Sequence, residues 1–155
     1  MLQLAEHTAR ENLAEARTVV AALQPAALQS ASLPDALRRL CTSFRAETEV
    51  VATVVVNGEA RPLPASEDVV LLRSAQEALA NIRKHAYART VTITLNYQSV
   101  GVCLSVVDDG HGFDADAQTS GYGLSGMRHR VAQVGGAMRL DSSPGGGTDL
   151  QVSLP

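Results

Sequence analysis

Hydrophobic and polar positions follow two periods along this chain, one typical of helices and one typical of strands. In residues 1–24 the apolar residues recur every three or four positions, at Leu2, Ala5, Ala9, Leu13, Ala16, Val20 and Leu23. This spacing predicts a helix with one apolar stripe, ended by Pro25. The stripe starts at the first residue without a capping sequence, so we expect the chain to continue upstream. The pattern leaves two interpretations open: a helix packed on its own domain, or half of a helical bundle.

Three further helices are predicted by similar spacing, at Pro34–Ala46, Ser66–Ala86 and Leu124–Val134. Ser32 and Ser66 are placed to cap the first two, and Gly135-Gly136 follows the third as a helix stop. A linker over residues 25–32 separates the first of these helices from residues 1–24. The apolar face of that first helix consists of Leu33, Leu37, Leu40 and Phe44.

Runs of β-branched residues predict five strands, at Val50–Val56, Thr90–Tyr97, Val100–Val107, Ala137–Ser142 and Thr148–Leu154. Asn57-Gly58 is typical of a turn after the first strand. The short link between the second and third strands indicates a hairpin, and the glycine-rich segment 143–147 indicates another turn. Helices mixed with hairpin-linked strands favour an α+β fold, with one mixed sheet and helices on one face.

Composition narrows the class of protein. The 155 residues, 45% of them apolar, suffice for one domain with a sizeable core. With 13 Lys+Arg against 16 Asp+Glu, the chain is no polycation, and we expect no nucleic-acid partner. No apolar run approaches the ~20 residues of a membrane span, so we expect no membrane contact by this chain. Its two cysteines form no CxxC motif, which favours a reducing, cytoplasmic location and argues against zinc.

The helix beginning near Ser66 carries the first candidate chemistry. On a wheel at ~100° per residue, four polar residues share one stripe, Glu77, Asn81, Lys84 and His85. The apolar stripe on the opposite side consists of Leu72, Ala75, Leu79, Ile82 and Ala86. A solvated surface is the simplest interpretation of the polar stripe. Its chemistry indicates more, because an amide oxygen can ligate Mg²⁺ and a lysine and a histidine can meet phosphate charge.

Three glycine clusters follow that helix, at Asp108–Gly112, Gly121–Gly123 and Gly145–Thr148. Asp108 stands at the end of a strand, where its carboxylate can accept a hydrogen bond from a planar amine. Gly121–Gly123 opens a helix, where free N–H groups favour phosphate. Each cluster alone is typical of a plain turn, but three in this order are more specific. No GxxxxGK[ST] is present, so the chain has no P-loop.

Together these motifs resemble the ATP-binding domain shared by histidine kinases, gyrase, Hsp90 and MutL, the GHKL or Bergerat fold. The similar elements are an N box at Glu77–Ala86, a G1 box at Asp108–Gly112, a G2 box at Gly121–Met127 and a terminal GxGT element at Gly145–Thr148. The resemblance covers residues 33–155 and implies a two-layer α/β sandwich. It implies that residues 1–24 are the end of the second helix of a dimerisation and phosphotransfer bundle.

The run Gly123–Val131 resembles the sensor kinases that pair with NarL-type response regulators. The resemblance implies that the γ-phosphoryl group of ATP passes to a histidine and then to a response regulator. His7 is followed by Thr8 rather than an acid, so the acceptor histidine is expected on a bundle outside this chain. A homodimer is expected for a full-length protein, and a monomer is compatible with this chain alone.

The resemblance also implies roles for the polar candidates. Asp108 would hold the adenine amine, and Thr148 would help to fix the base. Asn81 would ligate Mg²⁺ bridging the phosphates. Glu77 stands where related ATPases place a general base, and in kinases it would orient the metal shell. The phosphate or ribose contacts would come from Lys84 and His85.

The remaining candidates shape the site rather than react. The resemblance implies that the ends of a short nucleotide lid are formed by Gly110, Gly112, Gly121 and Gly123. Leu124 belongs to the nucleotide-binding set, although we expect it and Met127 mainly to pack their helix.

Two other functions stay open at this point. An anti-sigma-factor-type serine kinase shares the nucleotide fold, but the helix over 1–24 argues against it. A nucleotide-binding module without phosphotransfer is the second alternative. The presence of Glu77, Asn81 and Asp108 argues against that one.

Overall fold

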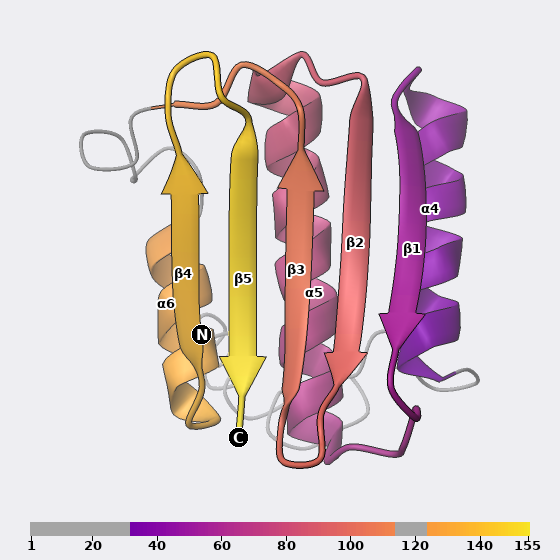
Figure 1. Ribbon diagram of the computed structural model, residues 1–155, viewed down its shortest axis with the longest axis vertical. Helices are drawn as coiled ribbons and strands as arrows, with labels where there is room; N and C mark the ends of the chain where they lie inside the picture. Colours follow the sequence, from indigo (N-terminus) through magenta and orange to yellow (C-terminus); the bar gives the residue numbers. More distant parts are fainter. Residues whose placement is uncertain (1–31, 114–123) are drawn as a thin grey trace, which may run out of the picture.

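The computed structural model describes residues 32–113 and 124–155. The described elements form two layers, a five-stranded sheet and a layer of helices that all lie on one face of it (Figure 1). The strand order is β1-β2-β3-β5-β4, with β1 parallel to β2 and every other neighbouring pair antiparallel. The expected α+β sandwich with a mixed sheet is confirmed. Apart from Ser32, the predicted helix over 1–24 and linker over 25–32 lie outside the described residues.

The helices of the described ranges are α4 (Leu33–Glu47), α5 (Ala65–Asn81), the π-helix η2 (Ile82–Ala86) and α6 (Leu124–Gln133). The strands are β1 (Val51–Asn57), β2 (Thr90–Tyr97), β3 (Val102–Asp108), β4 (Ala137–Ser142) and β5 (Thr148–Leu154). The bounds of β2, β4 and β5 agree with the prediction, and those of β1 differ by one residue. Within these ranges, no helix is both long and apolar enough to cross a membrane.

The predicted strand Val100–Val107 is wrong at both ends. The Gln98 N–H donates to the Gly101 carbonyl at 3.1 Å, which closes the β2–β3 hairpin before β3 begins. Val100 is therefore in the turn and is 80% exposed. At the other end the strand includes Asp108, because that residue still pairs with Val91 of β2 and Thr148 of β5.

The two predicted helix caps have different outcomes. The Asp35 N–H donates to Ser32 Oγ at 3.3 Å, so the cap of α4 is confirmed. The cap at Ser66 is wrong, because α5 begins one residue earlier and has no side-chain cap. The backbone carbonyl of Pro64 accepts the Glu67 N–H at 2.9 Å instead.

The hydrophobic core lies between the sheet and the helices. Alternate residues of β2 and β3 are buried, as their period of two requires, at Val91, Ile93, Leu95, Tyr97, Val102, Leu104 and Val106. The predicted apolar face of α4 is buried except for half-buried Leu40. The predicted apolar stripe of the next helix is buried at Leu72, Ala75, Leu79 and Ile82, and the side chain of Ala86 lies outside the description. Because α5 packs against β3 in this core, the C-terminal ends of α5 and β3 lie close together (Figure 1).

Asp68, in the first turn of α5, makes the stability of this fold depend on pH. Burial, and then the neighbouring Glu67, raise the pKa of its carboxyl from 3.8 to about 6. Between about pH 4 and 6 this carboxyl therefore binds more protons in the folded chain than in the unfolded chain, and it contributes a decline in the free energy of unfolding as pH rises. Asp68→Asn is expected to remove this decline, measured by urea unfolding across that range. Asp35→Asn, at an exposed first-turn acid of α4, is the control, and a decline unchanged in Asp68→Asn would contradict the assignment.

Candidate functional site

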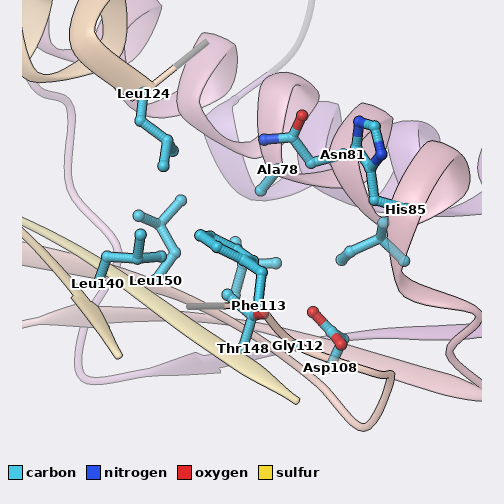
Figure 2. Close-up of a pocket in the computed structure, with 12 residues that line it drawn as sticks. Ala78, Asn81, His85, Asp108, Gly112, Phe113, Leu124, Leu140, Thr148 and Leu150 are labelled. Carbon is cyan, nitrogen blue, oxygen red and sulfur yellow. The ribbon is translucent and has the colours of Figure 1, made fainter. Parts of the chain in front are cut away.

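A pocket lies between the C-terminal part of α5, η2 and the helix-covered face of the sheet. Its empty space, part of which is open to solvent, is about 480 Å³. Figure 2 shows Asn81 and His85 on the helical side, with Asp108, Gly112, Phe113 and Thr148 on the sheet side. The complete lining is Ala78, Asn81, Ile82, His85, Val106, Asp108, Gly112, Phe113, Leu124, Leu140, Thr148 and Leu150.

Asp108 is the buried carboxylate of this pocket. It is the last residue of β3 and is only 6% exposed. The Gly110 N–H donates to its Oδ1 at 2.8 Å, which leaves Oδ2 for a second donor. Burial raises the pKa of this carboxyl above its usual value; the hydrogen bond from Gly110 opposes the rise, and the charge of Asp109 adds to it. A carboxylate held this way inside an apolar pocket is suited to an amino group of a ligand.

Asp109 follows Asp108 directly, but its side chain is exposed and has a structural role outside the pocket. Its Oδ1 accepts the Arg89 N–H at 2.8 Å and the Thr90 N–H at 2.9 Å. The N–H groups of Thr90 and then Arg89 hold the pKa of this exposed carboxyl below its usual value. Asp109 thus ties the start of β2 to the loop after β3 and does not line the pocket. The sequence shows two adjacent carboxylates at the end of one strand. Only the structure shows that Asp108 lines the pocket and that Asp109 connects the loop to β2.

The π-helix decides which polar residues of the predicted stripe reach the pocket. Its hydrogen bonds run over five residues rather than four, so each residue turns by less than the 100° of an α-helix. His85, four residues after Asn81, lies on the pocket side beside it (Figure 2). Lys84 is exposed and falls outside the lining, and half-buried Glu77 does too. The prediction that all four residues share one stripe assumed a continuous α-helix to Ala86, and that assumption is wrong.

Two of the glycine clusters meet at the edge of the pocket. Gly112 has φ +66, and a Cβ there would meet the carbonyl of Ser143 and, at 2.7 Å, the carbonyl of Gly147. Gly147 has φ +72, and a Cβ there would meet the carbonyl of Asp108. Only residues without a side chain allow the loop after β3 and the β4–β5 turn to approach this closely. The remaining cluster, Gly121–Gly123, lies outside the described residues.

Thr148 comes to the pocket through strand register, because it is the β5 partner of Asp108. The Oγ1 of Thr148 lies 2.9 Å from the Oγ of Ser142. The Ser142 hydroxyl donates to the Gly147 carbonyl at 3.0 Å. The predicted pairing of Asp108 with Thr148 in one site is therefore geometrically possible. Their roles toward a nucleotide remain predictions.

Most of the wall is apolar, and the sequence pattern did not assign these residues to a pocket. Leu124 was the one apolar candidate; it is 3% exposed and lines the pocket from the start of α6. Phe113 directly follows the G1 glycines, and its N–H donates to Ser142 Oγ at 2.9 Å. Its position beside Gly112 was a usable signal. The other apolar residues come from α5, η2 and three strands, and their ordinary core spacing carried no such signal.

A two-layer fold with an apolar, glycine-edged pocket and one buried carboxylate is suited to a planar, amino-bearing ligand. The protein family described as histidine kinase-, DNA gyrase B-, and HSP90-like ATPase matches residues 67–155. The chain therefore belongs to this family, and within it corresponds to the ATP-binding catalytic domain of sensor histidine kinases.

Individual relatives agree with this assignment. The sensor histidine kinase LiaS of Bacillus subtilis is 32% identical over 161 residues, spanning 99% of this chain and 42% of that protein. The signal transduction histidine-protein kinase/phosphatase UhpB of Salmonella typhimurium is 34% identical, spanning 90% of this chain and 28% of that protein. The chain thus spans less than half the length of these relatives.

Among solved structures, the histidine kinase domain of the Erythrobacter litoralis EL346 blue-light activated histidine kinase has the same fold. Its TM-score is 0.65 at 20% sequence identity, and the match covers 80% of this chain and 65% of that one. At this identity the likeness concerns the fold, and the assignment of the pocket depends on the residues described above.

Proposed function

We propose that this chain is the part of a sensor histidine kinase that binds Mg-ATP and transfers the γ-phosphoryl group to a histidine on a helical bundle. The observation that carries the proposal is the pocket, which combines a buried carboxylate with an amide and an imidazole on the opposite wall. Phosphoryl transfer needs mainly positioning and charge neutralisation, and these groups are suited to both.

In this proposal Asp108 selects the base. Its Oδ1 is already engaged by the Gly110 N–H, so Oδ2 is the acceptor for the exocyclic amine of adenine. Guanine presents a carbonyl at the corresponding position, and two acceptors would face each other there. Thr148, across the β3–β5 ladder, is placed to support the base edge. The apolar wall, with Phe113 and Leu150, covers the faces of the ring.

The phosphate side is assigned to α5 and η2. Asn81 offers an amide oxygen, a ligand type that Mg²⁺ accepts alongside waters and phosphate oxygens. Within the described ranges no three His, Cys, Asp or Glu side chains gather as a metal site. A metal held mostly by phosphates and water fits this single amide donor. When bound, Mg²⁺ would neutralise phosphate charge.

Glu77 and Lys84 are proposed for the same side from outside the pocket lining. Glu77 precedes Asn81 by one turn of α5, and residues four apart share a helix face. It is therefore placed to orient the metal shell. Lys84 is an exposed, flexible cation beside His85 that can reach phosphate. For Gly121 and Gly123 the proposal rests on the sequence motif alone.

Partners and location complete the proposal. The run Gly123–Val131, most of it in α6, supports a NarL-type response regulator as the receiver of the phosphoryl group. The full-length protein would act as a homodimer through its histidine-bearing bundle. The thiols of Cys41 and Cys103 are both free, which supports a reducing cytoplasm.

Asn81→Ala tests the metal assignment. Removing one amide ligand is expected to weaken Mg-ATP binding about tenfold, while binding measured with a chelator changes little. Calorimetric titration with and without Mg²⁺ measures both values. Gln76→Ala, at an exposed position of α5 outside the pocket, is the matched control. An equal loss with chelator present would count against a metal role for Asn81.

A further inference from the structure

Tyr87 ends the π-helix in a backbone conformation that favours glycine. Its φ is 51° and its ψ is 43°, and within the described ranges it is the one residue other than glycine with a positive φ. Helices commonly end in this conformation, but with glycine or asparagine, because a larger side chain costs free energy there. The side chain of Tyr87 is 80% exposed, so burial in the core does not offset that cost.

The contact that Tyr87 does make is with the loop after β3. Its ring lies against the imidazole of His111, with ring centroids 5.0 Å apart and planes inclined by 32°. His111 is itself exposed and stands between Gly110 and Gly112. Tyr87 and His111 together are called the aromatic bridge below.

The aromatic bridge joins the two walls of the pocket. Figure 2 shows His85 of η2 and Asp108 of the sheet at the same end of the pocket. Tyr87 follows His85 by two residues, and His111 follows Asp108 by three. The contact thus links the helical wall to the sheet wall just beyond the carboxylate.

A second contact also joins this part of the chain to the loop after β3. Asp109 already ties the same loop to the start of β2, through the N–H groups of Arg89 and Thr90. Tyr87 has a strained backbone and an exposed ring although Asp109 already connects the loop to β2. Backbone strain that the core does not require is typical of functional positions.

We infer that the aromatic bridge positions the loop Asp108–Gly112 for a purine nucleotide and sets how far the two pocket walls stand apart at the base end. Tyr87 and His111 are positioning residues in this inference, which rests on the proposed function. Gly112 and His85 both line the pocket, and each is close in sequence to one ring of the contact, so the contact constrains how far apart they stand. A purine base then enters a pocket that is already formed, and its binding does not have to supply the free energy of ordering the loop.

The test separates nucleotide affinity from stability. Tyr87→Gly removes the ring and also relieves the backbone, so the Tm is expected to stay level or rise. The Kd for ATP is expected to rise about two- to twelve-fold, the range of an aromatic pair. Tyr87→Phe keeps the ring and is expected to restore wild-type affinity. Val100→Gly, at an equally exposed position in the β2–β3 turn, is the control and should leave the Kd unchanged.

A double-mutant cycle identifies the partner. His111→Ala is expected to weaken ATP binding as much as Tyr87→Gly, and the double variant to lose no more than either alone. Additive losses, an unchanged Kd in Tyr87→Gly, or a lower Tm with the weaker binding would each overturn the inference. Failure of the wild-type chain to bind ATP would instead overturn the proposed function and this inference with it.

Discussion

Asp108→Asn is expected to lower the affinity for ATP by about 100-fold and to leave the fold intact. The carboxylate has two acceptor oxygens, one for the Gly110 N–H and one for the adenine amine. Asparagine keeps one acceptor and puts an NH₂ group in place of the other, so two donors face each other. Loss of a hydrogen bond to a buried charged group costs about 1.5–3 kcal/mol, which is roughly 10- to 150-fold in Kd.

Calorimetric titration with ATP and GTP measures this effect, and circular dichroism checks the fold. Asp109→Asn makes the same chemical change one residue later and is the matched control. Its amide oxygen still accepts from Arg89 and Thr90, so the expected loss is below about threefold, as for a surface substitution. An unchanged ATP affinity in Asp108→Asn would contradict the assignment of Asp108 to the adenine amine.

The same carboxyl makes ATP binding depend on pH. Burial raises the pKa of Asp108 above its usual value of 3.8, so its proton returns at a higher pH than in an exposed aspartate. The protonated carboxyl is a poorer acceptor for the adenine amine. ATP affinity should therefore fall as pH drops toward that raised pKa, and Asp108→Asn should lack this fall.

Gly112→Ala is expected to destabilise the fold by about 2–4 kcal/mol and to impair ATP binding. Two costs add at this position. The φ of +66 suits glycine, and a Cβ would also meet the carbonyls of Ser143 and Gly147. Both contacts are with backbone, which cannot rotate away, so the loop after β3 or the β4–β5 turn must move. Either movement changes the edge of the pocket beside Asp108.

Urea unfolding measures the stability of this variant, and titration measures its affinity. Gly145→Ala is the matched control, because Gly145 also has a positive φ, of +83, but a Cβ there meets nothing within 4 Å. It carries the conformational cost alone, about 1–2 kcal/mol. Equal stability of the two variants would contradict the close approach of the two glycine clusters.

Local pattern was sufficient for most of the fold. The bounds of β2, β4 and β5 were predicted correctly because alternation and turn residues are properties of neighbouring positions. Ser32 was a correct cap for the same reason. The errors at Ser66 and Val100 concern element ends, where a backbone hydrogen bond replaced the expected side chain or extended the turn.

The candidate site was predicted in part. Asn81, His85, Asp108, Gly112, Leu124 and Thr148 were named from the sequence, and all of them line the pocket. Lys84 does not, because the π-helix changes the rotation per residue after Asn81 and no pattern of side chains revealed it. Glu77, one turn before Asn81 in the regular part of α5, does not line the pocket either. The apolar wall was missed because its residues have the ordinary spacing of a core.

The sequence by itself determined the two-layer class, the order of elements and the residue types of the site, since these depend on periodicity and on motifs a few residues long. The tertiary structure alone decided how those motifs combine. Strand register put Thr148 beside Asp108, the missing side chains of Gly112 and Gly147 let two loops meet, and the turn at Tyr87 brought its ring to His111. Contacts between residues tens of positions apart depend on how the whole chain packs, and no local pattern carries that information.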